Sequence, residues 1–341
     1  MDKSIESIVK GPRQSNFELL RLIAMLLVVM VHANFFSLAS PTPQLFQTSP
    51  ALAWARVVAQ AMSLCCVDVF VLISGWFGIR ARAKGFCSLI FQWGYFAAIT
   101  FTALCVAGYD SLNPGSLCGI LMMQGGMWFI AAYIVLYVLS PVLNGFIDSA
   151  TTKRLAGVTA AFFAVEFYFG WAGALNMFSM GYSPLSFIGL YLLGALLKRL
   201  KRPAYRLGWA AYFGSVAVTS VAIWWTRIHE QWYVFDMATS YLSPFIILSA
   251  AGLVMWASSW RMGVSKFINW LSASALAVYL LHCSYGVLGG PFKQTVRSIC
   301  GGTSGMTTIA ALGGFVLAVY AAAILLDQPR KWLWKAVSRR R

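Results

Sequence analysis

Long apolar stretches follow one another along almost the whole chain, with only short connections between them. Charged residues make up 11% of the sequence, whereas a soluble domain carries about 25%. A helix needs about 20 apolar residues to cross roughly 30 Å of hydrocarbon. We therefore predict an all-α fold, a polytopic transmembrane helical bundle with about ten spans. They are placed at residues 17–38, 57–79, 86–107, 126–147, 155–171, 184–200, 207–226, 238–258, 267–288 and 307–326.

The basic residues between these spans predict the orientation. The chain has 26 Lys and Arg against 10 Asp and Glu, a net charge of +16. If the N-terminus is on the cytoplasmic side, only four of the 26 basic residues lie on the outer side of the membrane: Arg56, Arg227, Lys293 and Arg297. The positive-inside rule then predicts that both termini are cytoplasmic. Topology accounts for the basic charge, so the lipid bilayer is an expected partner and nucleic acid is not. No feature of the sequence indicates an oligomeric state.

Three segments follow from this topology. Residues 1–16 form a cytoplasmic N-terminal segment, residues 17–326 the transmembrane domain, and residues 327–341 a basic cytoplasmic tail that suits the inner leaflet. The first apolar stretch is too long for the core of a cleaved signal peptide, so we assign it as the first span. The seven cysteines are odd in number and lack metal-type spacing. They are predicted to be packing residues, and no metal site is expected.

Ionisable side chains inside spans are costly, and they are therefore candidate functional residues. The first span holds Arg21 and His32, which are 11 residues apart. This spacing puts both on one helix face, with a rise of about 16 Å between them. Glu18 shares that face. The alternative is structural: Arg21 extends toward the inner headgroups and His32 bonds a neighbouring backbone carbonyl.

Two further spans contain such groups. Asp68 lies in the second span, which ends at Arg80, Arg82 and Lys84. Asp68 could act at a site or pair with a cation or amide in the bundle, and the basic cluster could bind an anion or simply end the span. Ser74 and Gly75 could allow a close helix contact. In the ninth span, His282 lies about as deep as His32, so the two could meet across one cavity. A structural role for His282 is the alternative.

These stretches, in order, resemble acyltransferase family 3, the integral-membrane O-acyltransferases of bacterial cell-envelope polysaccharides. FELLRLIAMLLVVMVH carries an Arg-x10-His pattern as Arg21 and His32. DVFVLISGWF is similar to the second-helix signature, and Arg80 and Arg82 to the Arg-x-Arg that follows it. MWFIAAYIVLYVLSPVLN is similar to the family's Trp-Phe…Tyr…Pro stretch, and Trp128, Tyr133 and Pro141 stand at the matching positions. LSASALAVYLLH resembles a late helix of the family, although it is less Ser- and Tyr-like. Unlike in longer members of the family, no fused esterase-like domain is expected.

The resemblance implies an enzyme that moves an acyl group, acetyl on family grounds, from cytoplasmic acyl-CoA to a glycan hydroxyl. Arg80, Arg82 and Arg21 would bind the donor, whose phosphates suit arginine. His32 would be the general base or a covalent acyl carrier, because imidazole titrates near neutral pH. Arg21 would also stabilise developing negative charge, and Asp68 would orient one of these groups. Glu18, Trp128, Tyr133 and His282 are the expected substrate-binding residues.

Acyl-CoA and an envelope-glycan acceptor are therefore the expected partners, with no tightly bound cofactor. The expected location is the bacterial cytoplasmic membrane. A transporter or flippase of an envelope glycan or small solute is the main alternative, because buried His and Arg would also line a pore. Against it, the sequence has no inverted repeat and no matched pair of broken helices. A scaffold protein would not need Arg21 and His32 on one face. Motifs for ATP or dinucleotide binding and for soluble hydrolases are missing.

Overall fold

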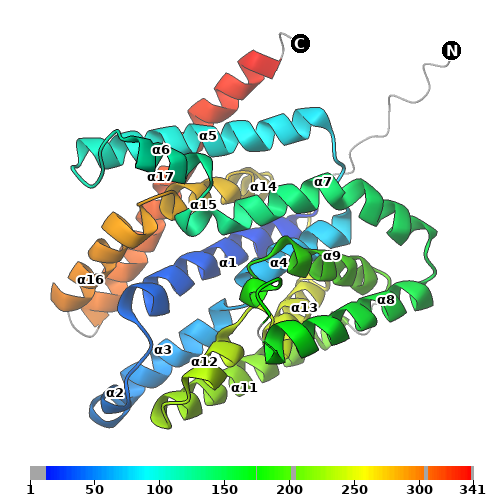
Figure 1. Cartoon of the computed structure of the whole chain (residues 1–341), viewed down its shortest axis with the longest axis horizontal. Coiled ribbons are helices and arrows are strands. Elements are labelled where there is room, and N and C mark those ends of the chain that lie inside the picture. Colours follow the sequence, from blue (N-terminus) through cyan, green and yellow to red (C-terminus); the bar gives the residue numbers. More distant parts are fainter. Residues whose placement is uncertain (1–12, 174, 201–204, 303–305, 339–341) are drawn as a thin grey trace.

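The computed structural model describes residues 13–173, 175–200, 205–302 and 306–338, and its regular structure within these ranges is entirely helical (Figure 1). The first half contains α1 (Ser15–Val31), η2 (His32–Phe36), α2 (Pro43–Thr48), α3 (Pro50–Ser63), α4 (Cys66–Phe77), α5 (Ala83–Val106), α6 (Pro114–Leu121), η3 (Gly125–Met127), α7 (Trp128–Ser149), α8 (Thr152–Val165) and η4 (Glu166–Ala172). The second half contains η5 (Ser179–Gly181), α9 (Pro184–Lys198), α11 (Gly208–Ile228), α12 (Trp232–Thr239), α13 (Pro244–Ser258), α14 (Lys266–Ser272), α15 (Ala275–Cys283), η6 (Leu288–Phe292), α16 (Lys293–Gly302) and α17 (Met306–Ser338). Most of the predicted N-terminal segment, residues 1–12, lies outside the described residues, as do Lys201, Arg202 and the last three arginines.

Every predicted span coincides with helical structure, and the described residues contain seven helices that are long and apolar enough to cross a membrane. The segments α14–α15 and η6–α16 meet at an angle of 80°, and there is an eighth candidate span if the two are counted together as one. Of the other two predicted spans, α9 is apolar but only 15 residues long, and α11 is long enough but less apolar. The all-α membrane fold is confirmed, while the number ten and the cytoplasmic termini stay predictions.

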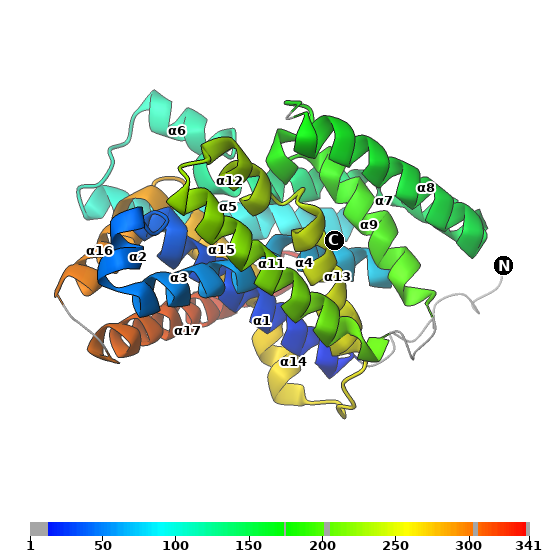
Figure 2. The ribbon, with the colours of Figure 1, turned by 90° about the horizontal axis from the view of Figure 1, so that it is seen from below.

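Helix α1 runs through the middle of the bundle (Figure 1). It contacts α3, α4 and α13 as well as the late helices α14 and α15, so the two ends of the chain's sequence meet around it. The same helices surround α1 when the molecule is seen from below (Figure 2). At His32 the α-helix changes directly into the π-helical turn η2. Such turns occur often at functional sites, because they redirect side chains without ending the helix.

Two glycines allow α4 and α9 to cross closely. A Cβ placed on Gly75 would lie 2.1 Å from the carbonyl oxygen of Tyr191, and one on Gly194 would lie 2.2 Å from that of Leu72. Any larger side chain would therefore push the two backbones apart. The close helix contact predicted at Ser74 and Gly75 is confirmed at Gly75. Helix α4 also packs against α1, and its residues Cys66, Val67, Phe70 and Ser74 line the cavity described below.

The predicted boundary between residues 326 and 327 falls inside the continuous helix α17. Asp327 is fully buried there and forms salt bridges with Arg330 at 2.8 Å and with Lys331 at 3.0 Å. Ser274 donates a hydrogen bond of 2.8 Å to the same carboxylate. The first residues of the predicted tail thus pack against the segment that leads into α15.

Candidate active site

A cavity of about 390 Å³ follows one face of α1 and is called here the Arg21 cavity. Arg13, Glu18 and Arg21 line it near the start of α1, and His32 lines it where α1 ends. An 11-residue separation in a helix corresponds to about 16 Å, so the cavity extends over about that length along α1. The face predicted to carry Glu18, Arg21 and His32 is therefore the face that lines a cavity.

A second cavity, of about 790 Å³, lies at the other end of α1 and is called here the Gln60 cavity. Loop and helix-end residues such as Ser40, Asp110 and Gly286 line it together with the buried Gln60. The two cavities share four lining residues: Val31, His32, Trp128 and Tyr241. His32 consequently faces both cavities, and among these four residues it is the one with a basic side chain.

The start of the Arg21 cavity is held together by Glu18. Its carboxylate forms a salt bridge with Arg21 at 2.5 Å and accepts a hydrogen bond from Ser272 at the end of α14. Glu18 is buried, whereas the Arg21 side chain keeps about a third of its surface exposed. The pair therefore fixes the guanidinium at the cavity wall while leaving part of it accessible to a ligand.

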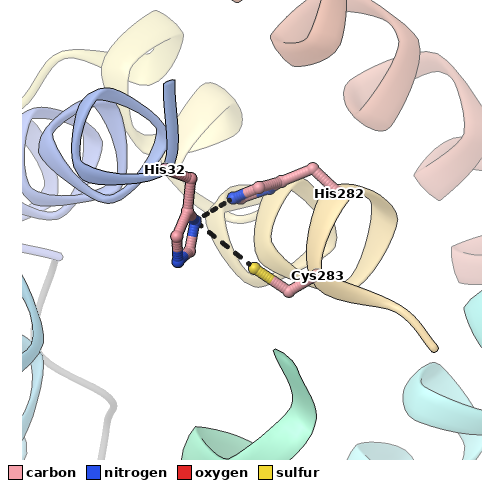
Figure 3. A group of neighbouring side chains, drawn as sticks. All are labelled: His32, His282 and Cys283. Carbon is pink, nitrogen blue, oxygen red and sulfur yellow. Dashed lines mark hydrogen bonds between the residues drawn. The ribbon is translucent and has the colours of Figure 1, made fainter. Parts of the chain in front are cut away.

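His32 and His282 meet, as their similar depth suggested. Nδ1 of His32 lies 3.0 Å from Nε2 of His282 (Figure 3). Nδ1 of His282 lies 2.6 Å from the carbonyl oxygen of Val278. A carbonyl only accepts hydrogen bonds, so in a neutral His282 the proton is on Nδ1 and Nε2 is an acceptor. His32 must then donate from Nδ1. Its own Nε2 is left with a free lone pair.

Four basic side chains hold the segment that follows His32. Arg56 donates to Asn34 at 3.1 Å and also to the carbonyl of Ala39. Arg297 donates to the carbonyl of Ser37 at 2.8 Å and Arg227 to that of Pro41 at 2.9 Å, while Lys293 lies 5.4 Å from the ring centroid of Phe36. These are the four basic residues that the topology prediction puts outside. Their contacts fix the turn on which His32 sits.

The structure does not bring Asp68 to this site. Asp68 is buried, but it lines neither cavity and its carboxylate oxygens form no hydrogen bond with Arg21 or His32. Asp68 lies on α4 next to Val67, which does line the Arg21 cavity. Neighbouring helical residues point about 100° apart, so Asp68 is turned away from the cavity. An orienting role for it has no supporting contact.

Arg80 and Arg82 lie in the connection between α4 and α5, and their side chains are exposed outside both cavities. The backbone of this connection is fixed, because Asn144 donates to the carbonyl of Ile79 and Tyr137 bonds the backbone of Arg82. The preceding Phe77 lies 5.9 Å from the Arg21 guanidinium. The two arginines therefore begin close to the Arg21 end of the first cavity rather than close to His32.

Trp128 and Tyr133 both line the Arg21 cavity, as expected for substrate-binding residues. The sequence did not indicate three further residues. Tyr182 and Tyr241 gather around Trp128, with ring centroids 4.4 and 5.8 Å from it. Cys283 was assigned to packing, yet its Sγ lies 3.6 Å from Nδ1 of His32. Its position directly after His282 was the one signal that could have singled it out.

Comparison with known proteins identifies the family to which this chain belongs. A family model described as an acyltransferase domain, that of acyltransferase family 3, matches residues 14–327. This range includes the His32–His282 pair and every residue that lines the two cavities except Arg13. No curated protein and no solved structure gave a match. The chain therefore belongs to acyltransferase family 3 and is a multi-pass membrane acyltransferase.

Proposed function

We propose that this acyltransferase moves an acyl group, acetyl in the simplest case, from cytoplasmic acyl-CoA to a hydroxyl group of a cell-envelope polysaccharide or its lipid-linked precursor. The donor enters the Arg21 cavity and the acceptor enters the Gln60 cavity. The observation that carries this assignment is the position of His32, which lines both cavities. The group transferred from one cavity to the other has to pass this side chain.

His32 acts as the general base in this scheme. Its free Nε2 takes the proton of the acceptor hydroxyl while the hydroxyl oxygen attacks the thioester carbonyl carbon. The carbon–sulfur bond then breaks, and the CoA thiolate takes the proton back from Nε2 of His32. His282 accepts the Nδ1 hydrogen bond of His32 throughout, so it stabilises the transient imidazolium as well as the starting tautomer.

The shape and polarity of the Arg21 cavity support a CoA donor. The cavity follows α1 for about 16 Å, which suits an extended pantetheine arm with its thioester at His32. Arg13 and Arg21 line its other end, and Arg80 and Arg82 begin nearby. Guanidinium groups bind phosphates through paired hydrogen bonds, so they would hold the nucleotide part outside.

The Gln60 cavity supports a sugar acceptor. It has twice the volume of the other cavity and combines aromatic rings with hydrogen-bonding groups. Trp128, Tyr182 and Tyr241 contribute aromatic rings to its lining, and Gln60 and Thr239 contribute polar side chains. A sugar ring has apolar C–H faces and several hydroxyl groups, so it could use both kinds of contact.

The predicted orientation puts the start of α1 and the Arg21 cavity on the cytoplasmic side. The acceptor would then be reached from the opposite side of a bacterial cytoplasmic membrane, and the acyl group would cross the membrane during transfer. Membership of an acyltransferase family speaks against the transporter alternative, because a carrier would need no acyl donor.

Transfer of labelled acetyl from acetyl-CoA into base-labile envelope glycan tests this function. Membranes that contain the wild type should incorporate label, and membranes that contain His32→Ala should not. His229→Ala, which changes an exposed histidine of an outer connection, is the matched control and should behave as the wild type. Equal incorporation by His32→Ala, at equal amounts of folded protein, would contradict the role of His32. No incorporation by the wild type, with acceptor glycan present, would contradict the O-acyltransferase assignment.

A further inference from the structure

Three metal-ligating side chains converge at the junction of the two cavities. Figure 3 shows His282 and Cys283 pointing from α15 toward the ring of His32 on the facing helix. Nδ1 of His32, Nε2 of His282 and Sγ of Cys283 all lie within 4.8 Å of one another. The three come from two segments about 250 residues apart, so no spacing motif could reveal them.

We infer that this cluster binds a zinc ion, and that zinc bound there inhibits the enzyme. Two imidazole nitrogens and one thiolate form a ligand set typical of Zn²⁺. With metal–nitrogen bonds of about 2.0 Å and a metal–sulfur bond of about 2.3 Å, tetrahedral ligands lie about 3.3 to 3.6 Å apart. The His32–His282 and His32–Cys283 atom pairs are separated by 3.0 and 3.6 Å.

The surroundings of the cluster suit a metal site with one open position. Nδ1 of His282 donates to the Val278 carbonyl at 2.6 Å, the kind of bond that orients a metal-bound histidine and exposes the other nitrogen as ligand. Nε2 of His282 is thus ready to bind. His32 lines both cavities, so an ion can reach the cluster through either, and a water molecule can complete the coordination.

Zinc binding requires two changes of protonation. The Cys283 thiol loses its proton to solvent and binds as thiolate. On His32 the hydrogen moves from Nδ1, which becomes a ligand, to Nε2. The lone pair that would accept the acceptor hydroxyl's proton is then no longer available. Because this inhibition depends on the proposed function of His32, binding and inhibition have to be measured separately.

Binding is measured on the purified full-length protein in detergent, without a polyhistidine tag, by Zn²⁺ titration against a chromophoric chelator. The wild type should bind one tight Zn²⁺, and Cys283→Ala should bind it about 100-fold more weakly or not at all. Cys65→Ala removes an equally buried thiol outside the cluster and should keep the wild-type affinity. Co²⁺ in place of Zn²⁺ should give a sulfur-to-metal charge-transfer band that is absent in Cys283→Ala. Equal Zn²⁺ affinity in the wild type and Cys283→Ala would overturn the site.

Inhibition is measured by acetyl transfer at increasing Zn²⁺. Because Cys283 lies beside His32, the rate of each protein is expressed relative to its own rate in the absence of metal. Cys283→Ala should resist Zn²⁺, whereas the wild type and Cys65→Ala should be inhibited. Tight binding through Cys283 without inhibition of the wild type would overturn the inhibitory role and also contradict His32 as base, while the metal site itself would stand.

Discussion

His32 and His282 are 250 residues apart in the sequence, and their imidazoles are joined by a hydrogen bond of 3.0 Å between Nδ1 and Nε2. The same His282 is anchored to the carbonyl oxygen of Val278. This chain of bonds fixes which nitrogen of His32 carries the proton. We therefore expect His282 to be a positioning residue whose loss changes catalysis more than substrate binding.

Replacing His282 by alanine should lower kcat by about 100-fold or more and leave the KM for acyl-CoA nearly unchanged. Loss of tautomer control costs a catalytic imidazole this much or more. His282→Gln keeps a side-chain acceptor and should recover part of kcat. An unchanged kcat in His282→Ala would mean that His282 only packs.

Arg21→Gln should raise the KM for acyl-CoA by about tenfold or more, because a charged contact to phosphate is lost. It also removes the shorter of the two salt bridges of the buried Glu18 and leaves only Arg13 at 4.0 Å, which should cost about 2 kcal/mol of stability. The double variant Glu18→Gln, Arg21→Gln removes both charges and should regain thermal stability in detergent. If the double variant also regained the wild-type KM, Arg21 would have no role in donor binding.

Gly126→Ala should abolish most activity, because it disturbs the helix that carries His282. A Cβ on Gly126 would lie 2.6 Å from the carbonyl oxygen of Cys283, which is backbone and cannot move aside. Tyr279 on the same helix also donates to the carbonyl of Gly126. Gly145→Ala on the adjacent α7 is the matched control, since its Cβ meets nothing within 4 Å. Full acetyl transfer by Gly126→Ala would show that α15 tolerates displacement.

Arg297→Gln should lower kcat by about tenfold while leaving the KM for acyl-CoA at the wild-type value. Its guanidinium holds the carbonyl of Ser37, and Ser37 in turn donates to the carbonyl of His32 at 2.6 Å. Loosening this turn misplaces His32 without touching the Arg21 cavity, and small misplacements of a catalytic group are costly. Arg261→Gln, an exposed arginine elsewhere, is the control and should have no effect. A change confined to KM would contradict the positioning role.

Local spacing predicted the first half of the site well. The 11 residues between Arg21 and His32, and the three between Glu18 and Arg21, put all of them on one helix face, and that face lines a cavity. The similar depth of His282 and His32 in their spans also predicted that the two side chains could meet, and they lie within hydrogen-bonding distance. The sequence could predict these positions because Glu18, Arg21 and His32 lie along one helix. The approach of His282 depends only on its height along the membrane normal.

The rest of the site depends on how distant segments pack, which periodicity within one segment cannot reveal. The Gln60 cavity is built from loops and helix ends contributed by many parts of the chain. Cys283 reaches His32 only because α15 crosses the end of α1 at this height. The role predicted for Asp68 stays a prediction. This buried side chain lines neither cavity, and its position within a span could not reveal which way it points on α4.

The most direct test of transfer between the two cavities uses sealed inverted membrane vesicles, whose outer surface is the cytoplasmic face. Labelled acetyl-CoA is added outside, and base-labile label is measured on envelope glycan enclosed in the lumen, with wild-type and His32→Gln protein at equal amounts. We expect lumenal glycan to be labelled by the wild type and not by His32→Gln. Label that appears in equal amounts with both proteins, or only on glycan outside the vesicles, would contradict transfer through His32 from the Arg21 cavity to the Gln60 cavity.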